Sequence, residues 1–303
     1  MPDPQIDPLD TLRAPIIPMA PDAAFAANLR DRLERAVLAS DQKEPSMSTE
    51  LTSRPRNGAH HGDVSYITLG LADLARGRAF YGAVLGWHFS AGSSEHGAQV
   101  DDIVPMIGLW DGEQPTGGRV HGAVLGFRVD DIAAAVVAVR AHGGTVTDPH
   151  REPYAMAAEG HDDQGVLFYL HEMASVARDS VPDDGEIHNG AVEGDVSYLT
   201  MVVSDVDAAQ AFYGGVFAWT FSVGRAGGAQ VTGVAPQMGM TTQPEAGPAT
   251  PGVTLCYRVD NIAEAVGRVR DAGGQAREPT QRPYGLESLC ADDQGTPFYL
   301  HQF

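Results

Sequence analysis

The chain has 303 residues, 43% of them hydrophobic, and carries a formal net charge of −20 at pH 7. A chain this acidic repels the phosphate backbone of nucleic acids, and no cluster of basic and aromatic residues offsets the charge, so nucleic acid is excluded as an expected partner. No apolar run approaches the roughly 20 residues needed to span a bilayer, so no membrane association is expected either.

The beginning of the chain and its cysteines bear on the compartment. Met1–Gln5 lack the basic and then apolar pattern of a secretory signal. Cys256 and Cys290 both lie in the second half of the chain, so they do not form a disulfide framework for the whole protein. The sequence therefore predicts a cytoplasmic protein.

Residues 1–61 are predicted to form a tail with one amphipathic helix and a linker. Asp22 can cap the helix, and apolar residues follow it at four-residue intervals, namely Phe25, Leu29, Leu33 and Val37. An isolated helix of about 17 residues is marginal in water, so its apolar stripe needs a surface to cover. Two interpretations remain open: the helix packs on its own domains or those of a dimer mate, or it docks onto another protein.

Beyond the tail, the chain repeats nearly the same sequence after about 130 residues. Three matches keep their order: Gly62–Tyr66 returns as Gly194–Tyr198, Phe80–Gly82 as Phe212–Gly214, and Asp162–Gly165 as Asp292–Gly295. A repeat of this length is the size of a small domain rather than of a solenoid unit. The sequence therefore predicts one domain over residues 62–172, a linker over 173–193 and a second domain over 194–303.

Each repeat divides into two β-α-β-β-β modules. In the first module, Val64–Leu71 reads as a strand and Asp73–Leu85 as a helix that Gly86 ends, and short strands follow near 87–90, 98–100 and 105–110. The second module has a strand over Ala123–Val129, a helix from Asp131 to the Gly143-Gly144 pair, and strands near 145–147, 155–159 and 166–172. The second repeat follows the same order, so the predicted fold class is α+β with four such modules.

This pattern resembles the vicinal oxygen chelate superfamily, which includes glyoxalases, extradiol dioxygenases, fosfomycin resistance enzymes and bleomycin-binding proteins. The resemblance covers residues 62–172 and 194–303, and it rests on the module order and on three motifs: Ala79–Trp87 after Asp73, Phe127–Asp131, and Asp163–Gly165. It implies that two paired modules curl their sheets around a shared cavity, and that the inner face carries the chemistry.

The resemblance also indicates where a metal ion would bind. Metal enzymes of the superfamily with a His-His-Glu set take one ligand from the first strand of each of two modules and one from the last strand. The corresponding residues are Tyr66, Val124 and Tyr169 in the first repeat and Tyr198, Thr254 and Tyr299 in the second. Neither set contains a histidine or a carboxylate, and a neutral phenol is a poor ligand for a divalent ion at neutral pH. We therefore expect no metal and no other cofactor.

Other polar residues are candidate replacements for the missing metal ligands. His121 lies three residues before Val124, so strand alternation directs it to the opposite face. His161-Asp162-Asp163 looks like a metal motif, but the second repeat has Ala291 in place of His161, and Asp-Asp-Gln-Gly is better read as a hairpin turn. Cys256 shares a strand face with Thr254, and its counterpart is Gly126, which favours a buried core thiol over a reactive one.

The remaining candidates would line an organic-ligand site. Tyrosines offer aromatic walls with hydroxyl tips, glutamines offer amides, and methionines offer soft apolar surface. His171 and His301 each follow the last-strand tyrosine by two residues and share its face, although a half-solvated, inert position at the strand end is the alternative. Tyr154 and Tyr284, each after a proline, either contact the ligand or pack the turn. The full predicted set is Tyr66, Gln99, Met106, Tyr154, Tyr169, His171, Tyr198, Gln230, Met238, Tyr284, Tyr299 and His301.

The sequence therefore favours a protein that binds a small organic molecule without a metal, in drug or metabolite sequestration. One alternative is a lyase, isomerase or dioxygenase-like enzyme with a non-standard metal set or a tyrosine acid or base. Another is a scaffold whose amino-terminal helix docks a partner. The expected partners are a small organic molecule and either a second copy of the chain or a protein that binds the helix.

Overall fold

The computed structural model describes residues 60–113, 121–152, 154–173, 191–243 and 251–303. The amphipathic helix predicted in the tail and most of the linker between the repeats lie outside these residues. The described residues of both repeats belong to one compact unit, Ser53–Phe303. None of the described helices is long and apolar enough to cross a membrane.

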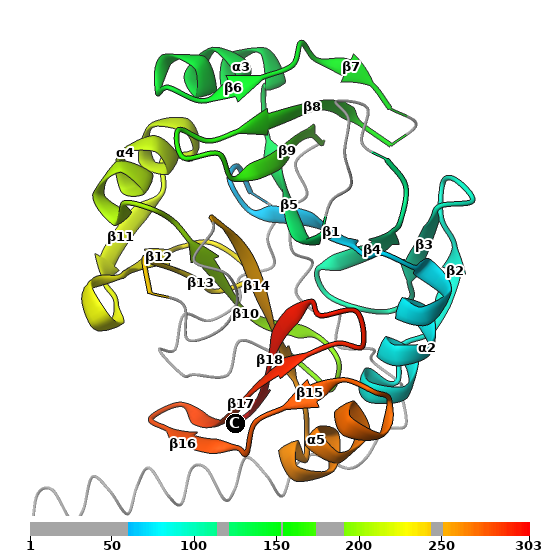
Figure 1. The fold of residues 1–303 in the computed structure, drawn as a ribbon. Helices are drawn as coiled ribbons and strands as arrows, with labels where there is room; N and C mark the ends of the chain where they lie inside the picture. The colour runs from blue at the N-terminus through cyan, green and yellow to red at the C-terminus, as the bar shows by residue number, and fades with distance from the viewer. Residues whose placement is uncertain (1–59, 114–120, 153, 174–190, 244–250) are drawn as a thin grey trace, which may run out of the picture. The chain divides into compact units, whose positions relative to one another are not determined.

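The structure confirms the α+β class and the four modules (Figure 1). The first repeat contains, in chain order, β1 (Val64–Gly70), α2 (Leu74–Leu85), β2 (Phe89–Ala91), β3 (Gly97–Val100), β4 (Met106–Trp110), β5 (Gly122–Val129), α3 (Ile132–Ala141), β6 (Thr145–Val146), β7 (His150–Arg151), β8 (Met156–His161) and β9 (Leu167–Glu172). The short strand β7 has no counterpart in the sequence prediction, because two residues give no readable alternation.

The second repeat has the same elements in the same order. They are β10 (Val196–Val202), α4 (Val206–Phe217), β11 (Thr220–Val223), the 3₁₀ turn η2 (Arg225–Gly227), β12 (Ala229–Thr232), β13 (Met238–Thr241), β14 (Gly252–Arg258), α5 (Ile262–Asp271), β15 (Gln275–Ala276), β16 (Thr280–Arg282), β17 (Gly285–Ala291) and β18 (Pro297–Gln302). The turn η2 lies between two strands that are joined directly by a bend and turn in the first repeat.

Polar side chains begin each of the described helices α2, α3, α4 and α5. Asp73, Asp131, Asp205 and Asn261 each accept a hydrogen bond from the backbone N–H three residues on. Such caps satisfy one of the donors that a helix leaves without an internal partner. The sequence prediction also began two of these helices at Asp73 and Asp131, from the spacing of their apolar residues.

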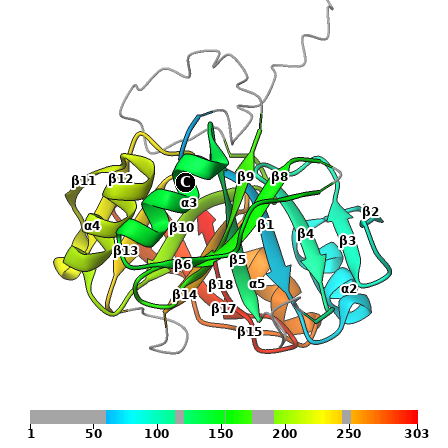
Figure 2. The ribbon, with the colours of Figure 1, turned by 90° about the horizontal axis from the view of Figure 1, so that it is seen from above.

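Strand pairing joins the two modules of each repeat through their first strands. In the first repeat β1 runs parallel to β4 and antiparallel to β5, and β5 in turn runs parallel to β9. The second repeat pairs β10 with β13 and β14, and β14 with β18, in the same directions. The neighbouring strands β1 and β5 can be followed in Figure 2. A single bridge, between Val253 and Ala123, links the sheets of the two repeats.

Contacts between helices join the two repeats. Helix α2 of the first repeat lies against α5 of the second, and α3 lies against α4 (Figure 1). The aromatic residues of this layer interleave: the rings of Trp87 and Tyr257 lie 5.4 Å apart, and those of Phe127 and Phe217 lie 4.8 Å apart. The hydrophobic core therefore continues from one repeat into the other.

Reciprocal hydrogen bonds hold this layer together. The hydroxyl of Tyr81 donates to Asp292 at 3.1 Å, and that of Tyr213 donates to Asp162 at 3.0 Å. Gln164 accepts from the backbone N–H of Asp205 at 2.7 Å, and Gln294 accepts from that of Asp73 at 2.7 Å. We call these four side-chain contacts the clasp. The Asp-Asp-Gln-Gly turns predicted from the sequence are present, and they supply one half of the clasp each.

Candidate functional site

The face of each sheet that is turned away from the helices carries most of the predicted ligand-binding residues. On β1, Ile67 and Leu69 belong to the hydrophobic core shared with the helices, so Tyr66 points to the other side. Val64 is also in the core because the strand register shifts between Val64 and Tyr66. The same alternation places Gln99 between the core residues Ala98 and Val100. We call this side the tyrosine face. It carries Tyr66, Gln99, Tyr169 and His171 in the first repeat and Tyr198, Gln230, Tyr299 and His301 in the second.

A tyrosine and a glutamine pair on this face in both repeats. Tyr66 Oη donates to Gln99 Oε1 at 3.0 Å, and Tyr198 Oη donates to Gln230 Oε1 at 2.6 Å. The Gln99 amide nitrogen is held in turn by the carbonyl of Ile107 at 2.9 Å, which fixes the orientation of the amide. Burial raises the pKa of Tyr66 and of Tyr198 to about 12, so both phenols stay protonated at neutral pH.

Two glycines make room for these phenols. A Cβ at Gly108 would collide with the hydroxyl of Tyr66, and a Cβ at Gly239 would collide with that of Tyr198. The sequence analysis did not identify these glycines. The available signal was their matching position in the two repeats, two residues into β4 and one residue into β13.

His171 is buried and held in one tautomer. Ser65 Oγ donates its hydrogen to the carbonyl of Gly126 at 3.0 Å, so toward His171 Nδ1, also 3.0 Å away, it can only accept. The proton of the neutral ring is therefore assigned to Nδ1, and Nε2 carries a lone pair. Burial lowers the pKa of His171 to about 4, which keeps the ring neutral at pH 7. The structure thus places His171 inside the face rather than at a solvated strand end.

The second repeat has a similar but looser arrangement. Ser197 Oγ donates to the carbonyl of Cys256 at 3.1 Å and lies 3.4 Å from His301 Nδ1. His301 is 5% exposed, and its Nε2 has no hydrogen-bond partner among the described residues. Burial lowers the pKa of His301, and the Glu287 carboxylate and the Tyr284 backbone oppose that shift.

The two tyrosines that follow prolines differ. Both rings stand edge-on to the neighbouring histidine, Tyr154 at 5.6 Å from His171 and Tyr284 at 5.0 Å from His301. Tyr154 is 64% exposed, whereas Tyr284 is half-buried and donates its hydroxyl to Glu287 at 2.7 Å. Both tyrosines therefore reach the tyrosine face, and only the second is hydrogen-bonded there.

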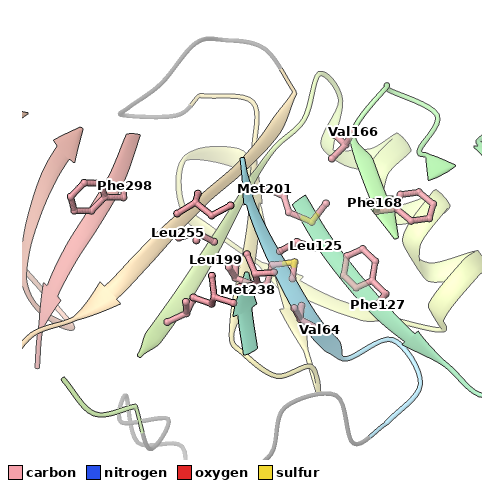
Figure 3. Close-up of a cluster of buried hydrophobic side chains, with 14 of the residues drawn as sticks. Val64, Leu125, Phe127, Val166, Phe168, Leu199, Met201, Met238, Leu255 and Phe298 are labelled. Atoms are coloured by element: carbon pink, nitrogen blue, oxygen red, sulfur yellow. The ribbon is translucent and has the colours of Figure 1, made fainter. Parts of the chain in front are cut away.

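The prediction for the methionines is wrong at Met238. Met106 lies on the tyrosine face and is 49% exposed, but Met238 is fully buried in the core (Figure 3). The parallel registers explain the error: Ile107 pairs with Ile67 and Met238 with Leu199, so Met238 is the counterpart of Ile107 rather than of Met106. Alternation then sends its side chain to the opposite side of the sheet.

The remaining polar candidates have structural roles. Asp162 Oδ1 accepts from the backbone N–H groups of Gln164 and Val166 at 2.9 and 2.8 Å, which is the predicted hairpin turn. Cys256 is 5% exposed, and burial raises the pKa of its thiol well above the usual range. Both observations agree with the interpretations favoured in the sequence.

The residues at the expected metal positions do not fit a divalent ion. Val124 has no donor atom, and the hydrogen of the Tyr66 hydroxyl is already committed to Gln99. Thr254 and Tyr198 in the second repeat are neutral hydroxyl groups at pH 7. Within the described part of the chain, no three histidine, cysteine, aspartate or glutamate residues gather to hold a metal. These positions therefore lack the side chains that commonly bind a divalent ion.

Sequence reasoning missed further residues on and around the tyrosine face. Ser65 was visible only as part of the repeated Gly-Asp-Val-Ser-Tyr motif. Glu159 is 9% exposed and faces Tyr169 across the β8–β9 ladder, where the second repeat has Leu289 opposite Tyr299. Arg225 lies over the ring of Tyr284, with its guanidinium carbon 4.7 Å from the ring centroid. Its position in η2 gave no signal in the sequence.

Comparisons with known proteins agree with this architecture. A family model described as a glyoxalase-like domain matches the chain twice, over residues 66–168 and 198–301. No curated protein matches the chain in sequence. The two matched segments together make up more than half of the chain, and each lies within one of the two repeats.

Several solved structures share the fold. A catechol 2,3-dioxygenase is 13% identical, with a TM-score of 0.57 over 81% of this chain and 89% of that one. The Mn(II)-bound glyoxalase from Novosphingobium aromaticivorans is 16% identical, with a TM-score of 0.56 over 80% and 82%. The 2,2',3-trihydroxybiphenyl 1,2-dioxygenase from Sphingomonas wittichii strain RW1 is 15% identical, with a TM-score of 0.54 over 80% and 91%.

At such identities the likeness to these structures shows the fold alone. The family match, the four modules and the shared fold agree with one another. The chain therefore belongs to the glyoxalase-like domain family of the vicinal oxygen chelate superfamily.

Proposed function

We propose that the protein binds a small planar organic molecule on a tyrosine face, without a metal ion. Its role would be to sequester a drug or a metabolite. The observation that carries the proposal is the hydrogen-bonded tyrosine and glutamine pair, Tyr66–Gln99, which recurs as Tyr198–Gln230. These tyrosines stand where the metal enzymes of the superfamily have a ligand. A rigid phenol beside an oriented amide offers an aromatic wall and a polar tip, which are the usual features of an organic-ligand site.

The surroundings of the pair support binding rather than metal chemistry. The rings of Tyr169 and His171 are nearly parallel, with an interplanar angle of 5° and centroids 6.4 Å apart. Tyr154 stands edge-on to the same imidazole. Three aromatic side chains and a neutral imidazole therefore border one face, and such surfaces favour flat molecules through stacking and apolar contact.

Differential scanning fluorimetry with a panel of planar aromatic and drug-like molecules tests the proposal. A ligand present at about 100 times its dissociation constant should stabilise the fold by about 2.7 kcal/mol and raise the melting temperature by several degrees. The rise should persist in protein treated with EDTA and desalted. A response seen only after metal is added back would overturn the metal-free part of the proposal.

Two variants test whether the ligand binds on the tyrosine face or elsewhere on the surface. Tyr169→Ala removes a half-buried ring from the tyrosine face, and we expect it to weaken the ligand response. Val223→Ala changes an apolar side chain that is 94% exposed on β11, and it should leave the response intact. Equal responses from both variants would argue that the ligand binds elsewhere.

A metal-independent proton-transfer enzyme, such as an isomerase or lyase, is the second candidate. The observation that favours it is His171, whose ring is neutral and whose Nε2 carries a lone pair beside the aromatic residues of the face. Such a group can accept a proton from a bound molecule. The test is product analysis of each ligand found by fluorimetry: turnover that His171→Gln abolishes without abolishing binding would support the enzyme, and recovery of unchanged ligand would support the binder.

A further inference from the structure

The two tyrosine faces are filled differently. In the second repeat, Cys256 and Tyr299 form a small buried hydrophobic cluster with Tyr198 and Leu289 packed against it. Tyr299 is only 9% exposed. The side chains of this repeat therefore occupy much of their own face, and an aromatic ligand would have to displace them.

The corresponding positions in the first repeat do not form such a cluster. Gly126 stands in place of Cys256, and the space beside it is taken by the His171 imidazole: a Cβ at Gly126 would lie 2.6 Å from His171 Cε1. Tyr169, the counterpart of Tyr299, is half-buried rather than buried. Glu159 replaces Leu289, which makes this face more polar.

Several contacts also hold Tyr284 of the second repeat in place. Tyr284 donates to Glu287 Oε2 at 2.7 Å, and Arg282 Nε binds Glu287 Oε1 at 3.1 Å. Arg225 covers the outer face of the Tyr284 ring. A cation–π contact and a charge-assisted hydrogen bond thus hold Tyr284 edge-on to His301.

The first repeat lacks both the carboxylate and the arginine that hold Tyr284 in the second. In the β8–β9 register Ala157 pairs with His171, whereas in the β17–β18 register Glu287 pairs with His301, so the carboxylate is replaced by a methyl group. The β2–β3 connection has no arginine where η2 has Arg225. Tyr154 is accordingly 64% exposed, and its side chain can move aside or close over a ligand without breaking a hydrogen bond.

The atoms that Tyr66 and His171 leave unused on the first face are hydrogen-bond acceptors. The hydrogen of Tyr66 is used by Gln99, which leaves the lone pairs of Tyr66 Oη. His171 Nδ1–H is used by Ser65, which leaves the lone pair of Nε2. Arg128, on the same strand side as Gly126, uses its Nη2 on the Asp130 carboxylate at 2.7 Å and the Met173 carbonyl at 3.2 Å, while its buried Nε has no partner among the described residues.

From these differences we infer that the ligand site lies on the tyrosine face of the first repeat alone, and that it takes a planar molecule whose edge donates a hydrogen bond to His171 Nε2 or Tyr66 Oη. The inference rests on the proposed function and narrows it to one repeat and one ligand chemistry. The second repeat then serves as a closed structural copy. A molecule of the same shape without the donor would bury an acceptor without a partner, which costs affinity.

Isothermal titration calorimetry with two matched pairs tests the chemistry: indole against 1-methylindole, and phenol against anisole. The inference expects one equivalent of indole or phenol per chain, with at least about tenfold weaker binding of the methylated partner. Equal affinity within each pair would overturn the donor requirement. Two equivalents per chain would overturn the assignment to one repeat and would leave the proposed function standing.

Fluorine NMR of the full chain labelled with 3-fluorotyrosine locates the ligand. The nine tyrosines can be assigned by single Tyr→Phe changes, and saturating indole should shift the signals of Tyr66, Tyr154 and Tyr169. Shifts confined to Tyr198, Tyr284 and Tyr299 would overturn the inference while supporting binding by the protein. If neither these probes nor any planar molecule of the fluorimetry panel binds, the inference and the proposed function fail together.

The Tyr66→Phe variant also tests whether the ligand binds in the first repeat. It removes one of the two acceptors and keeps the ring, so indole binding should weaken, by up to about tenfold, while the fold persists. The same change in the second repeat, Tyr198→Phe, should weaken it by less than about twofold. A larger loss from the second change than from the first would contradict the assignment.

Discussion

The hydroxyl of Tyr81 in the first repeat donates a hydrogen bond to the carboxylate of Asp292 in the second, across 3.1 Å in a fully buried setting. The equivalent hydrogen bond runs from the Tyr213 hydroxyl in the second repeat to Asp162 in the first, at 3.0 Å. The motifs that identify the family in the sequence therefore hold the two repeats together, and the residues that distinguish this chain lie on the tyrosine faces.

Removing one hydroxyl from the clasp should destabilise the protein. Tyr81→Phe leaves Asp292 buried without this donor, and hydrogen bonds to charged groups contribute about 1.5–3 kcal/mol. We expect a loss of about 2 kcal/mol in the free energy of unfolding, measured by urea denaturation. Tyr154→Phe is the matched control, because the Tyr154 ring is largely exposed and its hydroxyl should contribute little.

The first repeat should not be stable as a monomer. Helices α2 and α3 cover α5 and α4 of the second repeat, so a fragment ending at Met173 would expose the aromatic layer and leave Asp162 and Tyr81 without their partners. We expect such a fragment either to dimerise through the clasp or to aggregate, as seen by analytical ultracentrifugation. A monomer that unfolds cooperatively at micromolar concentration would contradict this expectation.

The buried His171 should make the fold sensitive to acid. Its pKa is about 4 in the folded protein and near 6.5 when unfolded, so between these values the unfolded chain binds more protons. Stability is then fully present above pH 6.5 and declines as the pH falls toward 4, by on the order of 3 kcal/mol. Urea denaturation of wild type and His171→Gln at several pH values measures the difference. The exposed His121→Gln should retain the wild-type slope.

An added methyl group beneath the first phenol should disturb the site. Gly108→Ala places a Cβ against the hydroxyl of Tyr66, so the ring must move and its bond to Gln99 is lost. Overpacking of this kind costs about 1–3 kcal/mol. We expect a lower melting temperature together with a loss of indole binding. Gly267→Ala, on α5 with open space around it, should not lower either quantity.

Neither cysteine should react in the native protein. Cys256 is 5% and Cys290 is 3% exposed, and burial raises the pKa of Cys290 to about 11, so little thiolate forms at pH 8. Ellman's reagent should label no thiol within minutes in native buffer and two after unfolding in guanidinium. Rapid labelling of the native protein would show that the second tyrosine face opens.

Local patterns predicted the fold well. Strand alternation placed Tyr66 and Gln99 on one side of the sheet, and Asp73 and Asp131 gave the helix starts, because these features depend on neighbouring residues. The register of a parallel pair depends on a distant strand, so the equivalence of Met106 and Met238 was misjudged. The tail helix predicted after Asp22 lies outside the described residues and stays a prediction.

The candidate site was predicted less completely. His171 and His301 were placed on the correct face, but the serines that orient them come from other strands, and no local pattern shows such a contact. The bond from Tyr81 to Asp292 spans 211 residues in sequence. Tyr284 is held by a cation–π contact with Arg225 and a hydrogen bond to Glu287, and these residues come from separate segments. Contacts of this kind become visible only in three dimensions.

The clasp has a consequence for how the two halves of the chain can change. Because each repeat supplies both a tyrosine and an aspartate, a change in either copy breaks a bond with the other, and the interface residues are held to the same identity in both. On the tyrosine faces the two copies already differ, with Gly126 in place of Cys256 and Glu159 in place of Leu289. In a duplicated chain of this kind, one repeat can keep a structural role while the other acquires a new ligand.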